Sequence, residues 1–159
     1  MIRLMQSSHG KKRAPMAGFT VIELLLTVVV LAILATIAAP NVTALLLSTR
    51  VKGAANDMYS ALIFARSEAI KRSANIDIVP ISAAWRDGWQ LKAGATILQQ
   101  QDAYPSTLSI VGPAGTISYQ RDGRLSGAAT ALFTISAPSN ATVKTKTVNV
   151  DLGGRVLVK

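Results

Sequence analysis

The sequence predicts an α+β protein in which one long N-terminal helix packs on a β-rich head of antiparallel strands. Three features of its 159 residues support this prediction. Residues 24–49 contain no ionisable side chain, apolar residues then recur at helical spacing to about residue 73, and from residue 74 the pattern alternates with period two. The helix therefore comes first in the chain and the sheet second.

Residues 1–18 form a basic leader with four cationic side chains and no acid. These are Arg3, Lys11, Lys12 and Arg13. A positive flank before an apolar run is expected to stay cytoplasmic while the C-terminal bulk is exported. A conventional secretory signal has a shorter apolar core with its small-residue cleavage site after that core. Here the small residues Ala17 and Gly18 come before the apolar run, so we expect a retained membrane helix.

The apolar run from Phe19 to Ala39 would span about 32 Å as a helix, close to the ~30 Å hydrocarbon core of a bilayer. Its one charged residue is Glu23. A carboxylate costs ~2.5–3.5 kcal/mol at the centre of a membrane helix, so a functional role is the first interpretation. The alternative is that Glu23 lies near the lipid head groups, where the penalty fades.

The segment Gly18-Phe19-Thr20-Val21-Ile22-Glu23 and the apolar helix after it resemble the type III signal of type IV pilins and type II secretion pseudopilins. The resemblance implies that prepilin peptidase cuts after Gly18 and methylates the new N-terminus at Phe19. It also implies that Glu23 docks on the N-terminal amine of a neighbouring subunit, an attraction that is strong in low dielectric. Residues 1–18 are then the leader and residues 19–40 the transmembrane and assembly half of the helix, in the bacterial inner membrane.

Removal of the leader would leave 141 residues with 13 basic and 8 acidic side chains, a net charge of +5 instead of +9. The single histidine, His9, would leave with the leader, and the chain has no cysteine. This excludes Ser-His and Cys-His catalysis, histidine metal sites and zinc fingers. Seven carboxylates besides Glu23 are scattered singly, without metal-loop spacing: Asp57, Glu68, Asp77, Asp87, Asp102, Asp122 and Asp151. We therefore expect no enzyme activity, no metal and no cofactor.

Pro40 is expected to kink the helix without ending it. The amphipathic continuation, residues 41–73, presents an apolar face that should pack in the globular domain, formed by residues 46–73 with the head at 74–159. The residues of this face are Val42, Leu45, Leu46, Ala54, Ala55, Met58, Leu62, Ala65, Ala69 and Ile70.

Short alternating segments separated by turn signals predict the strands of the head, in one antiparallel sheet or two small ones. The expected strands are 75–81, 89–91, 96–100, 106–111, 116–120, 130–136, 145–151 and 155–159. We expect flexible loops at residues 83–86 and 126–130.

Three further segments are similar to the GspH/FimT family of minor pilins and pseudopilins, which includes FimU-like proteins. They are Ala65-Arg66-Ser67-Glu68-Ala69, Asp122-Gly123-Arg124 and Gly154-Arg155-Val156. The resemblance implies the type IV pilin fold, other pilins or pseudopilins as partners, and a role in initiating pilus assembly at or near the tip. Pro40 favours the pilus members, and a minor pseudopilin of type II secretion is the alternative.

A second alternative is DNA binding in natural transformation, because FimT-like members carry a C-terminal Gly-Arg-x-Arg motif. Here Leu157 replaces the second arginine, and Lys159 would lie on the same strand face about 13 Å from Arg155. Arg155 and Lys159 are therefore candidate contacts to DNA. The alternative interpretation is that both belong to an ordinary solvated surface. Trp85 and Trp89 are interpreted as a satellite core or a pilin contact, with base stacking as the other alternative.

Overall fold

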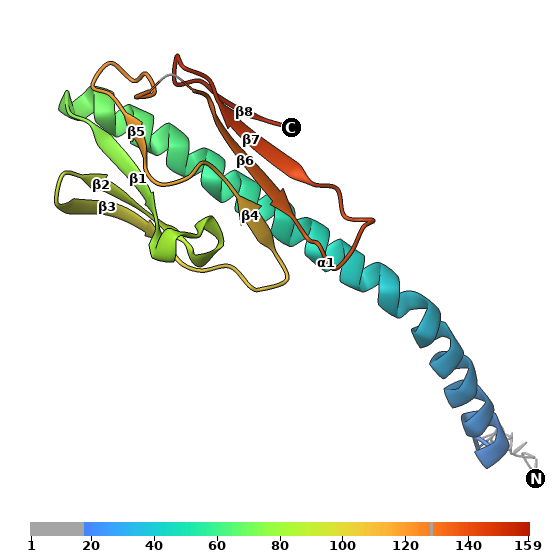
Figure 1. Ribbon diagram of the computed structural model, residues 1–159. Coiled ribbons are helices and arrows are strands. Elements are labelled where there is room, and N and C mark those ends of the chain that lie inside the picture. Colours follow the sequence, from blue (N-terminus) through green and yellow to red (C-terminus); the bar gives the residue numbers. More distant parts are fainter. Residues whose placement is uncertain (1–17, 128) are drawn as a thin grey trace, which may run out of the picture. The chain divides into compact units, whose positions relative to one another are not determined.

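Figure 1 shows the computed structural model, which describes residues 18–127 and 129–159, with the backbone alone for residues 37–41. The predicted leader therefore lies outside the described residues, except Gly18. The helix α1 runs from Val21 to Arg72, and two 3-10 turns follow, η1 (Ile81–Ala83) and η2 (Trp85–Asp87). The strands in this part of the chain are β1 (Ile76–Pro80), β2 (Trp89–Ala93), β3 (Thr96–Gln101), β4 (Ser109–Val111), β5 (Ile117–Tyr119), β6 (Ala131–Ser136), β7 (Lys146–Val150) and β8 (Val156–Val158).

The chain divides into two compact units, residues 1–38 and residues 39–159, and α1 contributes to both. In the first unit the described residues form the apolar start of α1. The backbone of α1 is helical through position 40, so Pro40 does not end it. The predicted kink at Pro40 stays a prediction.

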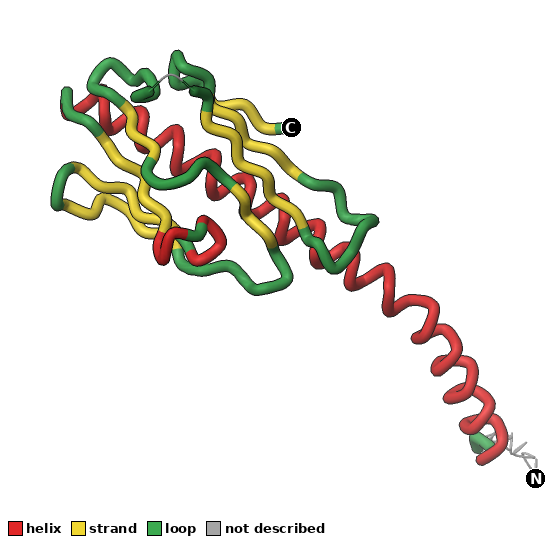
Figure 2. The backbone as a smooth tube through the Cα atoms, in the orientation of Figure 1, coloured by secondary structure: helices red, strands yellow, loops and turns green. Residues whose placement is uncertain are grey.

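The second unit contains two four-stranded antiparallel sheets and the later part of α1 (Figure 2). One sheet has the strand order β3-β2-β1-β5, and the other has the order β4-β6-β7-β8. Of the two arrangements left open by the alternating pattern, the structure adopts the two small sheets. Both bury alternate side chains against α1, as the period-two pattern requires.

The buried face of α1 follows helical spacing from Leu47 to Ala69 and is rich in alanine. Its apolar members are Leu47, Val51, Ala54, Ala55, Met58, Ala61, Leu62, Ala65 and Ala69. Small side chains allow close approach to the helix backbone, and Met58 and Leu62 are the largest fully buried side chains on this face. The buried residues of this face belong to a single hydrophobic core, which also contains residues of both sheets.

Four residues of the predicted apolar face are exposed instead: Val42, Leu45, Leu46 and Ile70. The first three precede Leu47, where burial of α1 in the second unit begins. Ile70 lines a surface groove described below. Hydrophobic spacing predicts which face of a helix is apolar, but the length of the covering sheets decides how much of that face is buried.

The predicted strands match the observed ones, with ends that coincide or are shifted by up to three residues. β2 continues to Ala93 because it pairs with β3 in a hairpin that turns at Gly94, where φ is +58°. The segment expected as the loop 83–86 instead contains most of η2. This turn places Trp85 in the hydrophobic core.

Candidate functional site

The described chain begins at the predicted processing site, and both residues of the expected cleavage bond are exposed. Gly18 has open space around the position that a Cβ would occupy. Packing therefore does not require glycine here, whereas entry of an extended backbone into a protease would favour it. Phe19 is 74% exposed.

Thr20 and Glu23 form half of a capping box at the start of α1. The backbone N–H of Glu23 donates to Oγ1 of Thr20 at 3.3 Å, and the N–H of Leu24 donates to the Thr20 carbonyl at 3.1 Å. In a complete capping box the glutamate carboxylate would also accept the N–H of the capping residue. No such bond occurs, and within residues 18–127 and 129–159 the Glu23 carboxylate has no hydrogen-bond or ion-pair partner. Helix capping therefore leaves this carboxylate available for an external cation.

The described residues of the first unit expose large apolar side chains along α1 and just before it. They are Phe19, Val21, Ile22, Leu24, Leu25, Leu26, Val28, Val29, Val30, Leu31, Ile33 and Leu34. A continuous apolar surface of this kind requires lipid or partner subunits to cover it. In the part of the chain that the structure describes, no helix satisfies the length and hydropathy criteria for crossing a membrane.

Arg66 of α1 connects the two glycine turns that the sequence resemblance singled out. Its Nε donates to the carbonyl of Gly123 at 3.1 Å, and its Nη2 donates to the carbonyl of Gly153 at 3.2 Å. The Gly123 turn follows β5, and the Gly153 turn joins β7 to β8. One guanidinium therefore joins the helix to an end of each sheet.

Close backbone contact between the same two turns explains why position 154 is a glycine. Gly154 has φ +79°, and a Cβ on it would lie 1.9 Å from the carbonyl oxygen of Gly123. The N–H of Gly154 donates to the Asp151 carbonyl at 2.9 Å, and Oδ1 of Asp151 accepts the N–H of Arg155 at 2.8 Å. These bonds determine where Arg155 and β8 begin.

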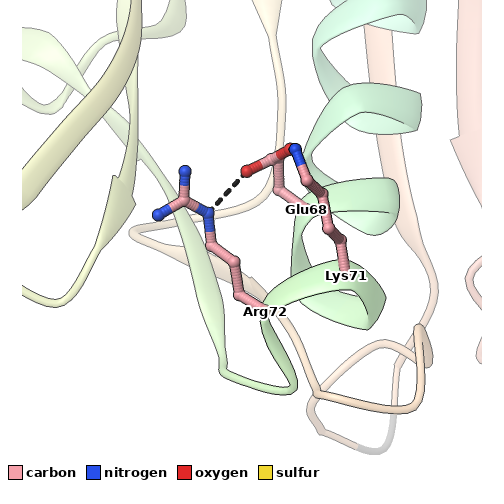
Figure 3. A network of polar contacts seen from close by, with 3 residues as sticks. All are labelled: Glu68, Lys71 and Arg72. Atoms are coloured by element: carbon pink, nitrogen blue, oxygen red, sulfur yellow. Dashed lines mark hydrogen bonds and ion pairs between the residues drawn. The ribbon is translucent and has the colours of Figure 1, made fainter.

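Glu68, the buried charged residue of the same helix, lies beside two cations of the last turn (Figure 3). Nζ of Lys71 is 3.2 Å from Oε1 of Glu68, and Nε of Arg72 donates to Oε2. The hydrogen bond from Arg72 and then that from Lys71 hold the pKa of Glu68 below its usual value, against the opposing effect of burial. Glu68 therefore has a structural role at the helix end, where cations are favourable.

The other scattered carboxylates also have mainly structural partners. Asp57 accepts a hydrogen bond from the Tyr104 hydroxyl at 2.8 Å, Asp87 pairs with Arg86, and Asp122 accepts the N–H of Arg124 in a turn. No group of three or more metal-ligating side chains is found within residues 18–127 and 129–159.

Both tryptophans lie in the main hydrophobic core rather than in the predicted satellite core, and their burial leaves no ring face open for base stacking. Trp85 is 4% exposed, its Nε1 donates to the Pro113 carbonyl at 2.8 Å, and its ring packs edge-on against Phe133. Trp89 is fully buried and stacks on Tyr104 at 5.8 Å between ring centroids. Burial, followed by the bond to Asp57, raises the pKa of Tyr104 above its usual value.

The two predicted nucleic-acid contacts are exposed at the two ends of β8. Arg155 pairs with Asp151 and Lys159 pairs with Thr147 through the backbone, so the strand pairing extends over residues 155–159 as predicted. Leu157 lies between the two cations and is 40% exposed. The contact with DNA stays a prediction.

A groove of about 530 Å³ lies between α1 and β8, which the sequence did not predict. Its helix wall contains Tyr59, Ile63, Arg66, Ser67 and Ile70, and its strand wall contains residues 154–157. The spacing of 59, 63, 66, 67 and 70 is that of one helix face, but the strand opposite it follows only from the tertiary structure.

Comparison with known proteins places these features in a family. A family model described as type II transport protein GspH matches residues 54–154, and a model of the prokaryotic N-terminal methylation motif matches residues 13–39. The first range includes Arg66, Gly123 and Gly154. No curated protein gave a significant match.

Solved structures show the same fold at low sequence identity. The type IV minor pilin FimU of Pseudomonas aeruginosa is 21% identical, with a TM-score of 0.62 over 70% of this chain and 89% of its own. The minor pseudopilin EpsH from the type 2 secretion system of Vibrio cholerae is 14% identical, with a TM-score of 0.54 over 69% of this chain and 96% of its own. The chain therefore belongs to the GspH family, has the type IV pilin fold, and is a minor pilin or pseudopilin of the type IV pilus and type II secretion group.

Proposed function

We propose that the chain is a minor pilin of a type IV pilus that helps to initiate pilus assembly and lies at or near the tip. The observation that carries this proposal is the unpartnered carboxylate of Glu23 in the first turn of α1. α1 then continues into the core of the second unit, so one helix contributes both the assembly motif and the support of the head.

Processing and membrane insertion are part of the proposal. Prepilin peptidase removes residues 1–18 and methylates Phe19, and α1 anchors the chain in the inner membrane with the C-terminal domain in the periplasm. The exposed apolar side chains within residues 19–34 are covered first by lipid and then by other pilins. In the filament, Glu23 pairs with the N-terminal amine of a neighbouring subunit in a medium of low dielectric.

A minor pseudopilin of type II secretion is the alternative function. The name of the matching family model and the likeness to EpsH support it. The resemblance described above favours the type IV pilus instead, because Pro40 is typical of the pilus members of the family. Loss of a pseudopilin should abolish export of folded enzymes, whereas loss of a pilus initiator should abolish surface pili and twitching.

A strain that lacks this chain, complemented with variants of it, tests the proposal. Glu23→Ala should be cleaved and methylated normally, as shown by the mass of its N-terminal peptide, but should lower the yield of sheared surface pili at least tenfold. Asp102→Ala is the matched control, since Asp102 is an exposed carboxylate without a side-chain partner in the described chain. Normal piliation with Glu23→Ala would contradict the role of Glu23. Normal piliation and twitching in the deletion strain, with lost enzyme secretion, would favour the pseudopilin.

A further inference from the structure

We propose that the groove between α1 and β8 binds an extended, carboxylate-bearing segment of a neighbouring pilin subunit, which adds to the free edge of β8. This inference rests on the proposed function as a filament subunit. Three independent features of the groove support it: its apolar walls, its open strand edge and its charge.

The walls expose large apolar side chains on both sides. On α1, Tyr59, Ile63 and Ile70 are 37%, 40% and 51% exposed, and Leu157 opposite them is 40% exposed. The volume of about 530 Å³ is enough for several side chains of a peptide. Covering these side chains would remove apolar surface from water, which is the main favourable contribution to association.

The strand wall presents backbone as well as side chains, because residues 154–157 line it consecutively. β8 is an edge strand, and among the strands of the described residues it pairs with β7 alone. Backbone bonds join residue 155 to 151 and residue 159 to 147, so the alternation of an antiparallel ladder directs the N–H and C=O groups of Val156 and Val158 away from β7. An incoming strand would bond to these groups, which is the mode known as β-augmentation.

The charge of the groove selects a carboxylate. Arg66 and Arg155 are the charged residues among its lining, and both are cations. Arg66 is held by the carbonyls of Gly123 and Gly153, whereas the guanidinium of Arg155 has no partner among the described residues. An Asp or Glu on the incoming segment would form a charge-assisted hydrogen bond with Arg155.

The same features favour a peptide over DNA in this groove. A nucleic-acid site presents a row of cations along a phosphate backbone. Here one uncommitted cation lies next to four exposed apolar side chains and an open strand edge. The Arg66 bonds also position the turn before β8, so the edge is prepared before the partner arrives.

Photo-crosslinking in filament-producing cells tests the inference with the full chain. Photoreactive p-benzoyl-phenylalanine replaces Leu157 in the groove or, as a matched control, Ile97, which is 50% exposed on β3 of the other sheet. The cross-linked peptide is then identified by mass spectrometry. We expect position 157 to cross-link to another pilin-type subunit, within a segment that contains Asp or Glu, and position 97 not to cross-link to that segment.

Charge variants show whether Arg155 selects the partner. Arg155→Glu should lower the adduct yield at position 157 about tenfold, the effect of losing one charge-assisted hydrogen bond, and Arg155→Lys should retain most of it. Arg155→Ser replaces the Glu variant if that chain does not accumulate. An unchanged yield in the Glu or Ser variant, no adduct, an adduct to DNA or an adduct to a second copy of this chain would overturn the inference.

Pili that require this chain but give no adduct at position 157 would overturn the groove inference alone, whereas pili that form without the chain would overturn the proposed function.

Discussion

The Nε of Arg66 donates a hydrogen bond to the carbonyl of Gly123, 57 residues further along the chain, at 3.1 Å. The Gly123 carbonyl in turn lies where a side chain on Gly154 would be. Two residues that the sequence resemblance singled out separately, Arg66 and Gly123, are therefore in direct contact. Arginine fits this position because its planar fork reaches two carbonyls, whereas lysine offers a single charged nitrogen.

Replacement of Arg66 should destabilise the head. We expect Arg66→Ala to lower the free energy of unfolding by about 1–3 kcal/mol, because the carbonyl of the buried Gly123 and that of the exposed Gly153 both lose a charged donor. Arg66→Lys should recover only part of this loss. The measurement is thermal unfolding of the full chain in detergent, followed by circular dichroism. Arg50→Ala, at an exposed arginine of the same helix, should change little, and an equal loss in both variants would contradict the bridging role of Arg66.

Gly154→Ala should be more damaging than the same change at a glycine with nearly the same φ but open surroundings. Gly115 has φ +76° and nothing within 4 Å of an added Cβ, so Gly115→Ala carries only the backbone penalty of ~1–2 kcal/mol. Gly154→Ala adds the clash with the Gly123 carbonyl, which we expect to cost about 1–3 kcal/mol more. The two melting temperatures, measured under identical conditions, check this difference. Equal losses would show that close contact between the turns is unimportant.

Stability should depend on pH through Glu68. Because Arg72 and Lys71 lower its pKa in the folded chain, the contribution of Glu68 is fully present above its usual value of 4.5 and is lost as the pH falls through the lower folded value. The melting temperature of the native chain should therefore exceed that of Glu68→Gln at pH 7, and this difference should shrink below about pH 4.5. Asp102→Asn serves as the reference, and a difference that stays constant down to pH 3 would contradict the pairing.

DNA binding by Arg155 and Lys159 has a quantitative signature. If both cations contact phosphates, the double variant Arg155→Gln, Lys159→Gln should reduce the slope of log affinity against log salt by about 1.8 on duplex DNA. Gel-shift titrations of the full chain in detergent at several salt concentrations measure this slope. A slope that does not change would remove these residues as a nucleic-acid site.

Much of the fold could be predicted because its determinants are local. The unbroken apolar run and helical spacing predicted one helix to about residue 73, and α1 ends at Arg72. Alternation predicted the eight strands, since a half-buried strand must place apolar side chains on one face. The motif Gly18–Glu23 likewise depends on adjacent residues, so it can be recognised without any tertiary contact.

Other features depend on contacts between distant segments, and only the tertiary structure decided them. Which apolar residues of α1 are buried depends on where the sheets end, so Val42 and Ile70 are exposed although their spacing suits a core. Arg66 and the turns at Gly123 and Gly153 are far apart in sequence, and no local pattern pairs them. The groove beside β8 likewise requires a helix face and a strand edge to meet. By itself the sequence determined the type and order of the elements, because propensity and periodicity act within a few residues, whereas packing decided which surfaces remain open to partners.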